Sequence, residues 1–182
     1  MEYQRVGRTL VYHGAILDVY QDHMKISNGH EADWDFIDHK GAAAIVAEDA
    51  DGKILMVRQY RNTLDGYTLE IPAGGLNPEE SMAECAAREL EEETGFRAEK
   101  VDFLVDFVAT VAYSNEKIGI YWTDSLLPSK QHLDEDEDVE VLRYSIDELT
   151  DMILDGRIVD GKTIAAIMAY QVKKNRSAKE HK

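Results

Sequence analysis

Three glutamates close together in the chain are the residues best suited to hold a metal ion. Glu89 and Glu93 are four residues apart and Glu92 is three from Glu89, so on a helix the carboxylates occupy neighbouring positions of one side. They could form a solvated acidic face, or they could bind a hard cation such as Mg²⁺, which would relieve their mutual repulsion. Spacing by itself leaves both interpretations open.

Two neighbouring features favour the metal site. Arg88 lies beside Glu89 and four residues before Glu92, where it can orient carboxylates by charge-assisted hydrogen bonds; a surface salt bridge is the simpler alternative. Upstream, the segment Ala73-Gly74-Gly75 reads as a tight glycine loop. The backbone carbonyl of Ala73 could serve as a further metal ligand there, and an ordinary loop is the alternative.

The glutamates are expected on a helix from about Ser81 to Thr94. Ser81 is the predicted N-cap, Glu84 its capping-box partner, and Gly95 the stop signal. An apolar stripe on the opposite side would pack this helix on a sheet and hold the carboxylates in place. The stripe consists of Ala83, Ala87 and Leu90.

The glycine, the helix carboxylates and the arginine together reproduce a known motif. The matching residues are Gly74, Glu80, Arg88, Glu89, Leu90, Glu92, Glu93, Gly95 and Phe96. They resemble the Nudix box at every defined position. From ordinary residue usage, its charged and glycine positions would coincide by chance with a probability on the order of 10⁻⁸ per starting point, so the metal site is the better interpretation.

The resemblance implies a fold, a reaction and a set of roles. Nudix proteins are α/β proteins with an α/β/α sandwich and a mixed sheet, and they hydrolyse a nucleoside diphosphate linked to another moiety with Mg²⁺ or Mn²⁺. By position, Glu89, Glu92 and Glu93 would be metal ligands, in addition to the carbonyl of Ala73 considered above. Arg88 and Glu92 would belong to the catalytic set, and Glu80 would be a supporting acid.

A narrower resemblance, to the ADP-ribose pyrophosphatase branch, covers most of the chain. It implies that Arg61 of VRQYR approaches the substrate and that Glu116 of SNE reaches the distal ribose. It also implies that Trp34 and Phe36 stack on the adenine. The alternatives are a surface arginine, a solvated loop acid and ordinary sheet packing.

The acidic run LDEDEDVEV leads into a strand, where the branch has a loop that closes over the diphosphate. Alignment on that strand gives Glu135 and Glu137 as the general base and an extra metal ligand. Glu137 is assigned as the ligand, but which of the two is the base stays open. A solvated, mobile segment is the alternative.

One departure from the branch concerns substrate choice. Val111 and Ala112 stand where these enzymes usually have proline and glycine, so the preferred sugar is left open. GDP-mannose, NADH or another dinucleotide are alternatives to ADP-ribose, and an oxidised nucleoside triphosphate or a capped RNA is further removed. A non-catalytic, nucleotide-sensing module is disfavoured by the intact box.

The remaining pattern predicts two parts. Residues 1–40 contain three short strand-like runs, which suggest a small antiparallel β subdomain, and residues 41–182 would form the Nudix domain. Within that domain, 41–49 and 53–60 read as a hairpin of buried strands, followed by a strand at 67–72. Further strands are expected at 101–111, 117–126 and 139–145, helices at 146–156 and 162–175, and a frayed tail at 176–182.

Bulk composition limits the location and the partners. A net charge of −16 argues against binding nucleic acid. The sequence has no apolar run of membrane-spanning length and no secretory signal, so we expect a cytoplasmic protein. Its one cysteine, Cys85, is expected in the core. The resemblance also implies a homodimer with exchanged N-terminal strands, in which residues 1–40 contribute to dimerisation and base contacts.

Overall fold

The computed structural model describes residues 2–133 and 138–180, and its chain divides into two compact units. The first unit combines Met1–Gly41 with Val108–Lys117, and the second combines Ala42–Phe107 with Ile118–Lys182. The N-terminal strands are therefore joined by a ten-residue segment from the middle of the chain, which the sequence did not group with them.

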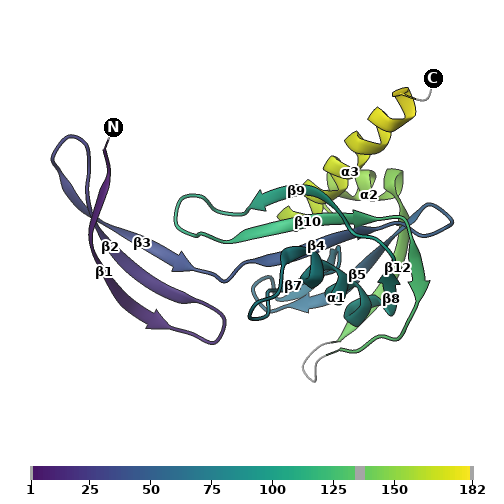
Figure 1. The fold of residues 1–182 in the computed structure, drawn as a ribbon, viewed down its shortest axis with the longest axis horizontal. Coiled ribbons are helices and arrows are strands. Elements are labelled where there is room, and N and C mark those ends of the chain that lie inside the picture. The colour runs from purple at the N-terminus through teal and green to yellow at the C-terminus, as the bar shows by residue number, and fades with distance from the viewer. Residues whose placement is uncertain (1, 134–137, 181–182) are drawn as a thin grey trace. The chain divides into compact units, whose positions relative to one another are not determined.

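Three antiparallel strands make up most of the first unit (Figure 1). They are β1 (Gln4–His13), β2 (Asp18–Lys25) and β3 (Glu31–Asp38), in the order β1-β2-β3. The second segment of the unit attaches to β3, because Ile37 donates its N–H to the carbonyl of Tyr113 at 2.7 Å. Side chains of β1 are exposed along its whole length, so the strands of this unit bury little apolar surface by themselves.

The described residues of the second unit form three sheets. The first has the order β7 (Ala73–Gly75), β4 (Ala42–Ala47), β10 (Lys117–Thr123), β9 (Asp102–Val108) and is mixed, since β4 is parallel to β10 and antiparallel to β7. The second is antiparallel, with the order β12 (Val139–Ser145), β5 (Lys53–Arg61), β6 (Gly66–Glu70). The third pairs β11 (Leu126–Pro128) with β8 (Phe96–Ala98).

The predicted hairpin of β4 and β5 is wrong. The two strands lie in different sheets, and a single bridge between Glu48 and Ile54 joins the segments. Both edges of β4 are occupied by β7 and β10, and both edges of β5 by β12 and β6. The edges that a β4–β5 hairpin would use are therefore taken by other strands, among them β10 and β12 from much later in the chain, so closeness in sequence did not decide this pairing.

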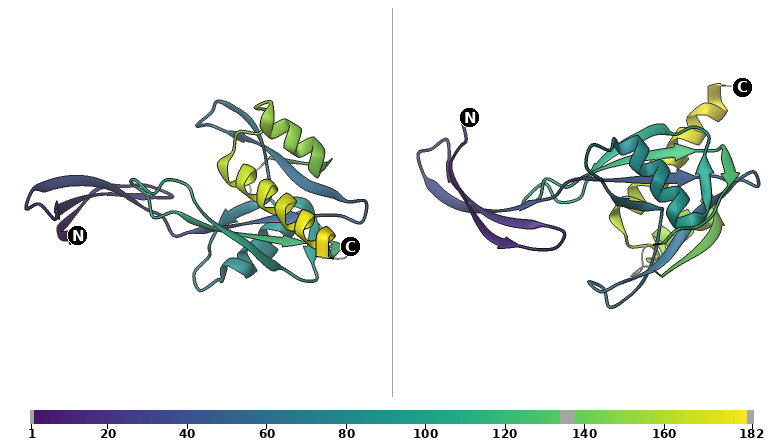
Figure 2. Two further views of the ribbon diagram at one scale, coloured as in Figure 1. Left: turned by 90° about the horizontal axis from the view of Figure 1, so that it is seen from above. Right: turned by 60° about the horizontal axis from the view of Figure 1, so that its bottom comes forward.

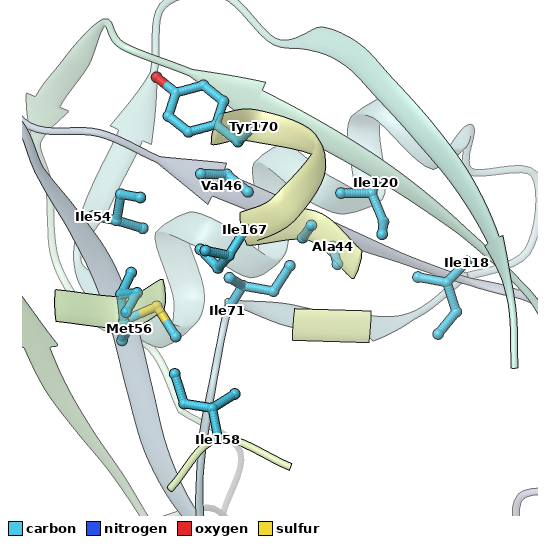
Figure 3. Packing of buried hydrophobic residues seen from close by; sticks show 12 residues of the cluster. Ala44, Val46, Ile54, Met56, Ile71, Ile118, Ile120, Ile158, Ile167 and Tyr170 are labelled. Atoms are coloured by element: carbon cyan, nitrogen blue, oxygen red, sulfur yellow. The ribbon is translucent and has the colours of Figure 1, made fainter. Parts of the chain in front are cut away.

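Helices cover both sides of the strands: α1 (Met82–Thr94) on one side, α2 (Ile146–Leu154) and α3 (Gly161–Glu180) on the other. Figure 2 brings α3 to the front in its left view and α1 in its right view. Side chains of β4 alternate between the two, because Ala43 and Ile45 pack with α1, whereas Ala44 and Val46 pack with α3 (Figure 3). The α/β/α sandwich is therefore confirmed.

The caps of α1 are as predicted, but its buried side differs. Ser81 accepts a hydrogen bond from the N–H of Glu84, whose side chain bonds back to Ser81, and Gly95 ends the helix with φ 72°. Cys85, Ala86 and Leu90 are fully buried. Of the predicted stripe only Leu90 is buried. The side of the helix that packs against β4 carries Cys85 and Ala86 in place of Ala83 and Ala87.

The last helix is longer than the pattern suggests. It continues through Arg176 to Glu180, where a frayed tail was expected. Residues 176–180 include alanine, lysine and glutamate, which favour helix, and neither glycine nor proline interrupts them. Within the described residues, no helix is long and apolar enough to cross a membrane.

Candidate active site

Gly74 lies on a short edge strand, and its lack of a side chain makes room for a carboxylate. The segment Ala73–Gly75 pairs antiparallel with β4, so the predicted loop is a strand. A Cβ on Gly74 would lie 2.0 Å from Oε1 of Glu89. Glycine is needed here because α1 brings Glu89 against the strand, and no tight turn is involved.

Arg88 is the centre of the carboxylate cluster. Its Nε and Nη2 donate to the two oxygens of Glu80 at 2.8 and 2.9 Å. Nη1 donates to Glu89 at 2.6 Å and to Glu92 at 2.8 Å, and Nη2 also reaches the carbonyl of Gly75 at 3.0 Å. The hydrogen bonds to these carboxylates raise the pKa of Arg88, so the guanidinium stays charged. One side chain thus joins the segment before α1, the C-terminal half of α1 and β7.

The hydrogen bonds from Arg88 lower the pKa of Glu80 to about 2, against the opposing effect of burial. A further hydrogen bond from the N–H of Asn77, at 3.0 Å, acts in the same direction. Glu80 is therefore ionised at neutral pH and fastens the loop before α1 to the helix.

Replacing Glu80 by glutamine is expected to lower the Tm at neutral pH, because the ion pair with Arg88 is lost. The folded-state pKa of Glu80 is below its ordinary value of 4.5, so its stabilising effect is present above about pH 4.5 and is lost as the pH falls toward 2. The Tm difference between wild type and variant should shrink over that window. Thermal unfolding followed by circular dichroism measures it, and a difference independent of pH would contradict the ion pair.

Glu93 is buried, unlike Glu89 and Glu92. Its side chain is 3% exposed, and Oε2 accepts a hydrogen bond from the N–H of Ala73 at 3.0 Å. This bond links the last turn of α1 to the strand that carries the predicted carbonyl ligand. The carboxylate and the carbonyl of Ala73 are therefore held in one local structure.

A cavity of about 250 Å³ opens between β7 and α1. It is lined by Ala73, Gly74, Gly75, Asn77, Arg88, Glu89, Glu92 and His132. The structure thus brings together at one cavity Arg88 and three of the predicted metal ligands. Asn77 and His132 also line it, and neither was singled out in the sequence.

The donors of this cavity are carboxylate and carbonyl oxygens, the chemistry that hard divalent cations prefer. In residues 2–133 and 138–180, no three acidic, histidine or cysteine side chains are grouped closely enough to hold an ion. Arg88 binds both Glu89 and Glu92 here. The residue types fit a cation. Arg88 contacts one oxygen of each carboxylate, Oε1 of Glu89 and Oε2 of Glu92, and an ionised carboxylate has further acceptor positions that an ion can use.

Comparison with known proteins identifies the family. A model of the NUDIX domain matches residues 38–167. The chain belongs to the Nudix family. It is 33% identical over 175 residues to the ADP-ribose pyrophosphatase of Bacillus subtilis (strain 168), covering 95% of each chain. It is also 34% identical to the methanol dehydrogenase activator of Bacillus methanolicus, covering 89% of each.

The fold has a counterpart among solved structures. A crystal structure of an ADP compounds hydrolase superposes with a TM-score of 0.87 over 97% of this chain and 96% of that chain, at 22% identity. An identity this low supports the fold alone. The Nudix fold predicted from the box is confirmed by the family match and by this superposition.

Arg61, the expected substrate contact of the Nudix domain, lies at the end of β5. Its Nε and Nη2 donate to the carboxylate of Glu70 at 2.8 and 2.9 Å. Its side chain is 41% exposed. The hydrogen bonds to Glu70 raise the pKa of Arg61, and the negative charge of Glu93 adds to this effect. The guanidinium therefore lies within electrostatic reach of α1.

The three other expected substrate contacts lie in the first unit. Trp34 is 46% exposed on β3, whereas Phe36 is partly buried. One face of the Phe36 ring is covered by Arg8, whose Cζ lies 4.0 Å from the ring centroid. Glu116 lies 3.9 Å from Nε2 of His39. Trp34 is therefore the more accessible of the two aromatic candidates, and the roles of all three stay predictions.

Both candidate bases, Glu135 and Glu137, lie outside the described residues. The chain just before them is fastened to α1: the N–H of His132 donates to the carbonyl of Glu92 at 2.9 Å, and Nε2 of Gln131 donates to that of Glu93 at 2.7 Å. These donors satisfy carbonyl groups that the helix end leaves unpaired. The adjoining acidic run was the signal that could have drawn attention to His132.

Proposed function

We propose that the protein hydrolyses the diphosphate bond of ADP-ribose or a related nucleoside diphosphate sugar, in a reaction that requires a divalent metal and yields AMP, or another nucleoside monophosphate, and a sugar phosphate. The observation that carries the proposal is an intact Nudix box whose Arg88, Glu89 and Glu92 line one cavity. Similarity to an ADP-ribose pyrophosphatase over 95% of both chains supports the substrate class.

The residues of the cavity divide the work. Bound Mg²⁺ or Mn²⁺ would lower the pKa of the attacking water and neutralise charge on the diphosphate. Ala73, Glu89, Glu92 and Glu93 would hold the ion by carbonyl and carboxylate oxygens. Arg88 would orient the carboxylates, as its hydrogen bonds to Glu89 and Glu92 favour. The proton of the attacking water would pass to Glu135 or Glu137, of which Glu137 would also be an additional ligand.

Substrate contacts are proposed for both units. Arg61 would bind the diphosphate, Glu116 the distal ribose, and Trp34 with Phe36 the adenine. We propose a homodimer with exchanged N-terminal strands, which the exposed apolar residues of β1 (Val6, Leu10, Val11 and Tyr12) support; light scattering measures the assembly directly. Cytoplasmic location stays a prediction from the sequence, which fractionation of the producing cells would check.

Purified protein should release a nucleoside monophosphate from ADP-ribose only when Mg²⁺ or Mn²⁺ is present, because the helix carboxylates need an ion to act on a diphosphate. Chromatography of products from ADP-ribose, other ADP-sugars, GDP-mannose and NADH, with and without a chelator, measures this. Metal added back should restore activity. If none of these substrates gives a metal-dependent monophosphate, the proposal is wrong.

A further inference from the structure

Glu70 is a buried carboxylate that the proposed chemistry does not use. It ends β6, is 2% exposed, and accepts two hydrogen bonds from Arg61 and one from the hydroxyl of Thr68 at 2.6 Å. The ammonium group of Lys162 also bonds to its Oε2. A carboxylate this deeply buried is tolerated only when it is paired, and here two cations from separate parts of the chain pair with it.

Lys162 belongs to the first turn of α3, and the start of this helix is fastened to the same place. Asp160 accepts a hydrogen bond from Nζ of Lys162 at 3.0 Å and one from the N–H of Thr163 at 2.9 Å, so it also caps the helix. The hydroxyl of Thr163 in turn accepts the N–H of Ile71 at 3.0 Å. Glu70 and its successor are thus held by α3 through two independent contacts.

The charges of this network keep Glu70 ionised. Burial alone would raise its pKa, but the hydrogen bonds from Arg61, Lys162 and Thr68 and the charge of Lys162 together lower it to about 2. At neutral pH the carboxylate is therefore negative and holds both cations. Its two oxygens define where the guanidinium of Arg61 lies and which edge of that group faces away.

Arg61 uses only one edge for this contact. Nε and Nη2 bind Glu70, while Nη1 has no hydrogen-bond partner among the residues that the structure describes. The side chain is 41% exposed, so the outer edge of the guanidinium can meet an anion from solvent. A planar guanidinium fixed on one edge presents its remaining donors in a set direction, which suits a phosphate group.

We propose that Glu70 and Lys162 are positioning residues that hold Arg61 in the orientation in which its outer edge binds a phosphate of the substrate. The inference rests on the proposed function, since it assigns a phosphate of that substrate to Arg61. Lys162 neutralises Glu70 and keeps its carboxylate turned toward β5. Without Lys162, Arg61 has to order itself on binding, and that cost weakens the substrate complex.

The chain provides a matched control for testing Lys162. Lys174, also on α3, makes two hydrogen bonds of 2.7 Å to Glu48 and is 43% exposed, against 12% for Lys162. Both lysines pair with a glutamate near a strand of the same unit. Lys174→Met therefore removes a lysine–glutamate ion pair from the same helix, although a more exposed one, without touching the Arg61 network.

Lys162→Met is expected to raise the KM for ADP-ribose about tenfold and to change kcat by less than about threefold. A tenfold effect is of the ordinary size for the coupling between residues of one hydrogen-bond network. Lys162→Arg should recover most of the affinity, and Lys174→Met should match wild type. In the double variant Arg61→Met, Lys162→Met, the KM should be no higher than in Arg61→Met alone, because Lys162 acts through Arg61. Steady-state kinetics below the Tm of every variant measures these effects.

Two outcomes would overturn the inference: a lowered Tm of Lys162→Met with unchanged KM, or effects of the two substitutions that multiply in the double variant. A second measurement, titration calorimetry of inorganic pyrophosphate binding in the presence of Mg²⁺, distinguishes failure of this inference from failure of the proposed function. Wild type that binds pyrophosphate but hydrolyses none of the diphosphates refutes the function, while weaker binding by Lys162→Met still supports the inference. No binding by wild type refutes the inference as well.

Discussion

Glu93→Gln should lower kcat at least about 100-fold while leaving the Tm close to that of wild type. Loss of a group that only supports a metal ligand typically costs 10- to 100-fold, so loss of a ligand should cost at least as much. Glutamine has the same shape, and its oxygen can still accept the N–H of Ala73, which lies 3.0 Å from Oε2 in the native side chain. The change therefore removes the charge at the buried end of the box and keeps the contact that joins α1 to β7.

Glu91→Gln is the control for this variant. Glu91 lies on the same helix, and its carboxylate accepts a hydrogen bond from the hydroxyl of Ser129, outside the cavity. It should retain wild-type turnover, measured as release of nucleoside monophosphate with saturating Mg²⁺. Undiminished turnover in Glu93→Gln would remove Glu93 from the metal site and leave Glu89 and Glu92 as its helix ligands.

Gly74→Ala should also lose activity about 100-fold, but with a small loss of stability. The new Cβ would lie 2.0 Å from Oε1 of Glu89, so the carboxylate must move. Because it is the far end of a flexible side chain, the fold can absorb that movement. The active site cannot, since displacement of a catalytic group by about 1 Å can cost two orders of magnitude in rate.

Gly75→Ala is a control one residue away. A Cβ there would meet no heavy atom within 4 Å, and the carbonyl that accepts from Arg88 is retained. This variant should be at least about ten times more active than Gly74→Ala. The comparison uses kcat together with a melting curve for each variant. Equal activity of the two variants would show that the approach of Glu89 to β7 does not matter for turnover.

Local features of the fold could be predicted because their partners are close in the chain. The capping box of Ser81 and Glu84 spans three residues, and the left-handed Gly95 directly follows the helix it ends. The buried character of β4 likewise follows from its own composition. The pairing of β4 could not be read from the chain, because its parallel partner β10 is more than seventy residues away and any buried apolar strand could occupy that edge.

The candidate site, too, could be predicted from the sequence only where it depends on residues close together in the chain. The box indicated Arg88, Glu89 and Glu92, since a metal cluster built on one helix requires carboxylates at helical spacing. The burial of Glu93 and the closeness of Gly74 to Glu89 depend on how α1 packs against β7. His132 was missed for a related reason, because its position depends on a backbone hydrogen bond to Glu92, which the acidic run beside it signals only indirectly.

The sequence by itself determined the family, the helix of the box and its caps, and it indicated the candidate ligands, because all of these depend on residue types at short, regular spacing. Only the tertiary structure decided which strands pair, why Gly74 has to be glycine, and that Lys162 shares Glu70 with Arg61. The lysine and the glutamate are 92 positions apart. Contacts over such a distance depend on how whole elements pack, which no local pattern specifies.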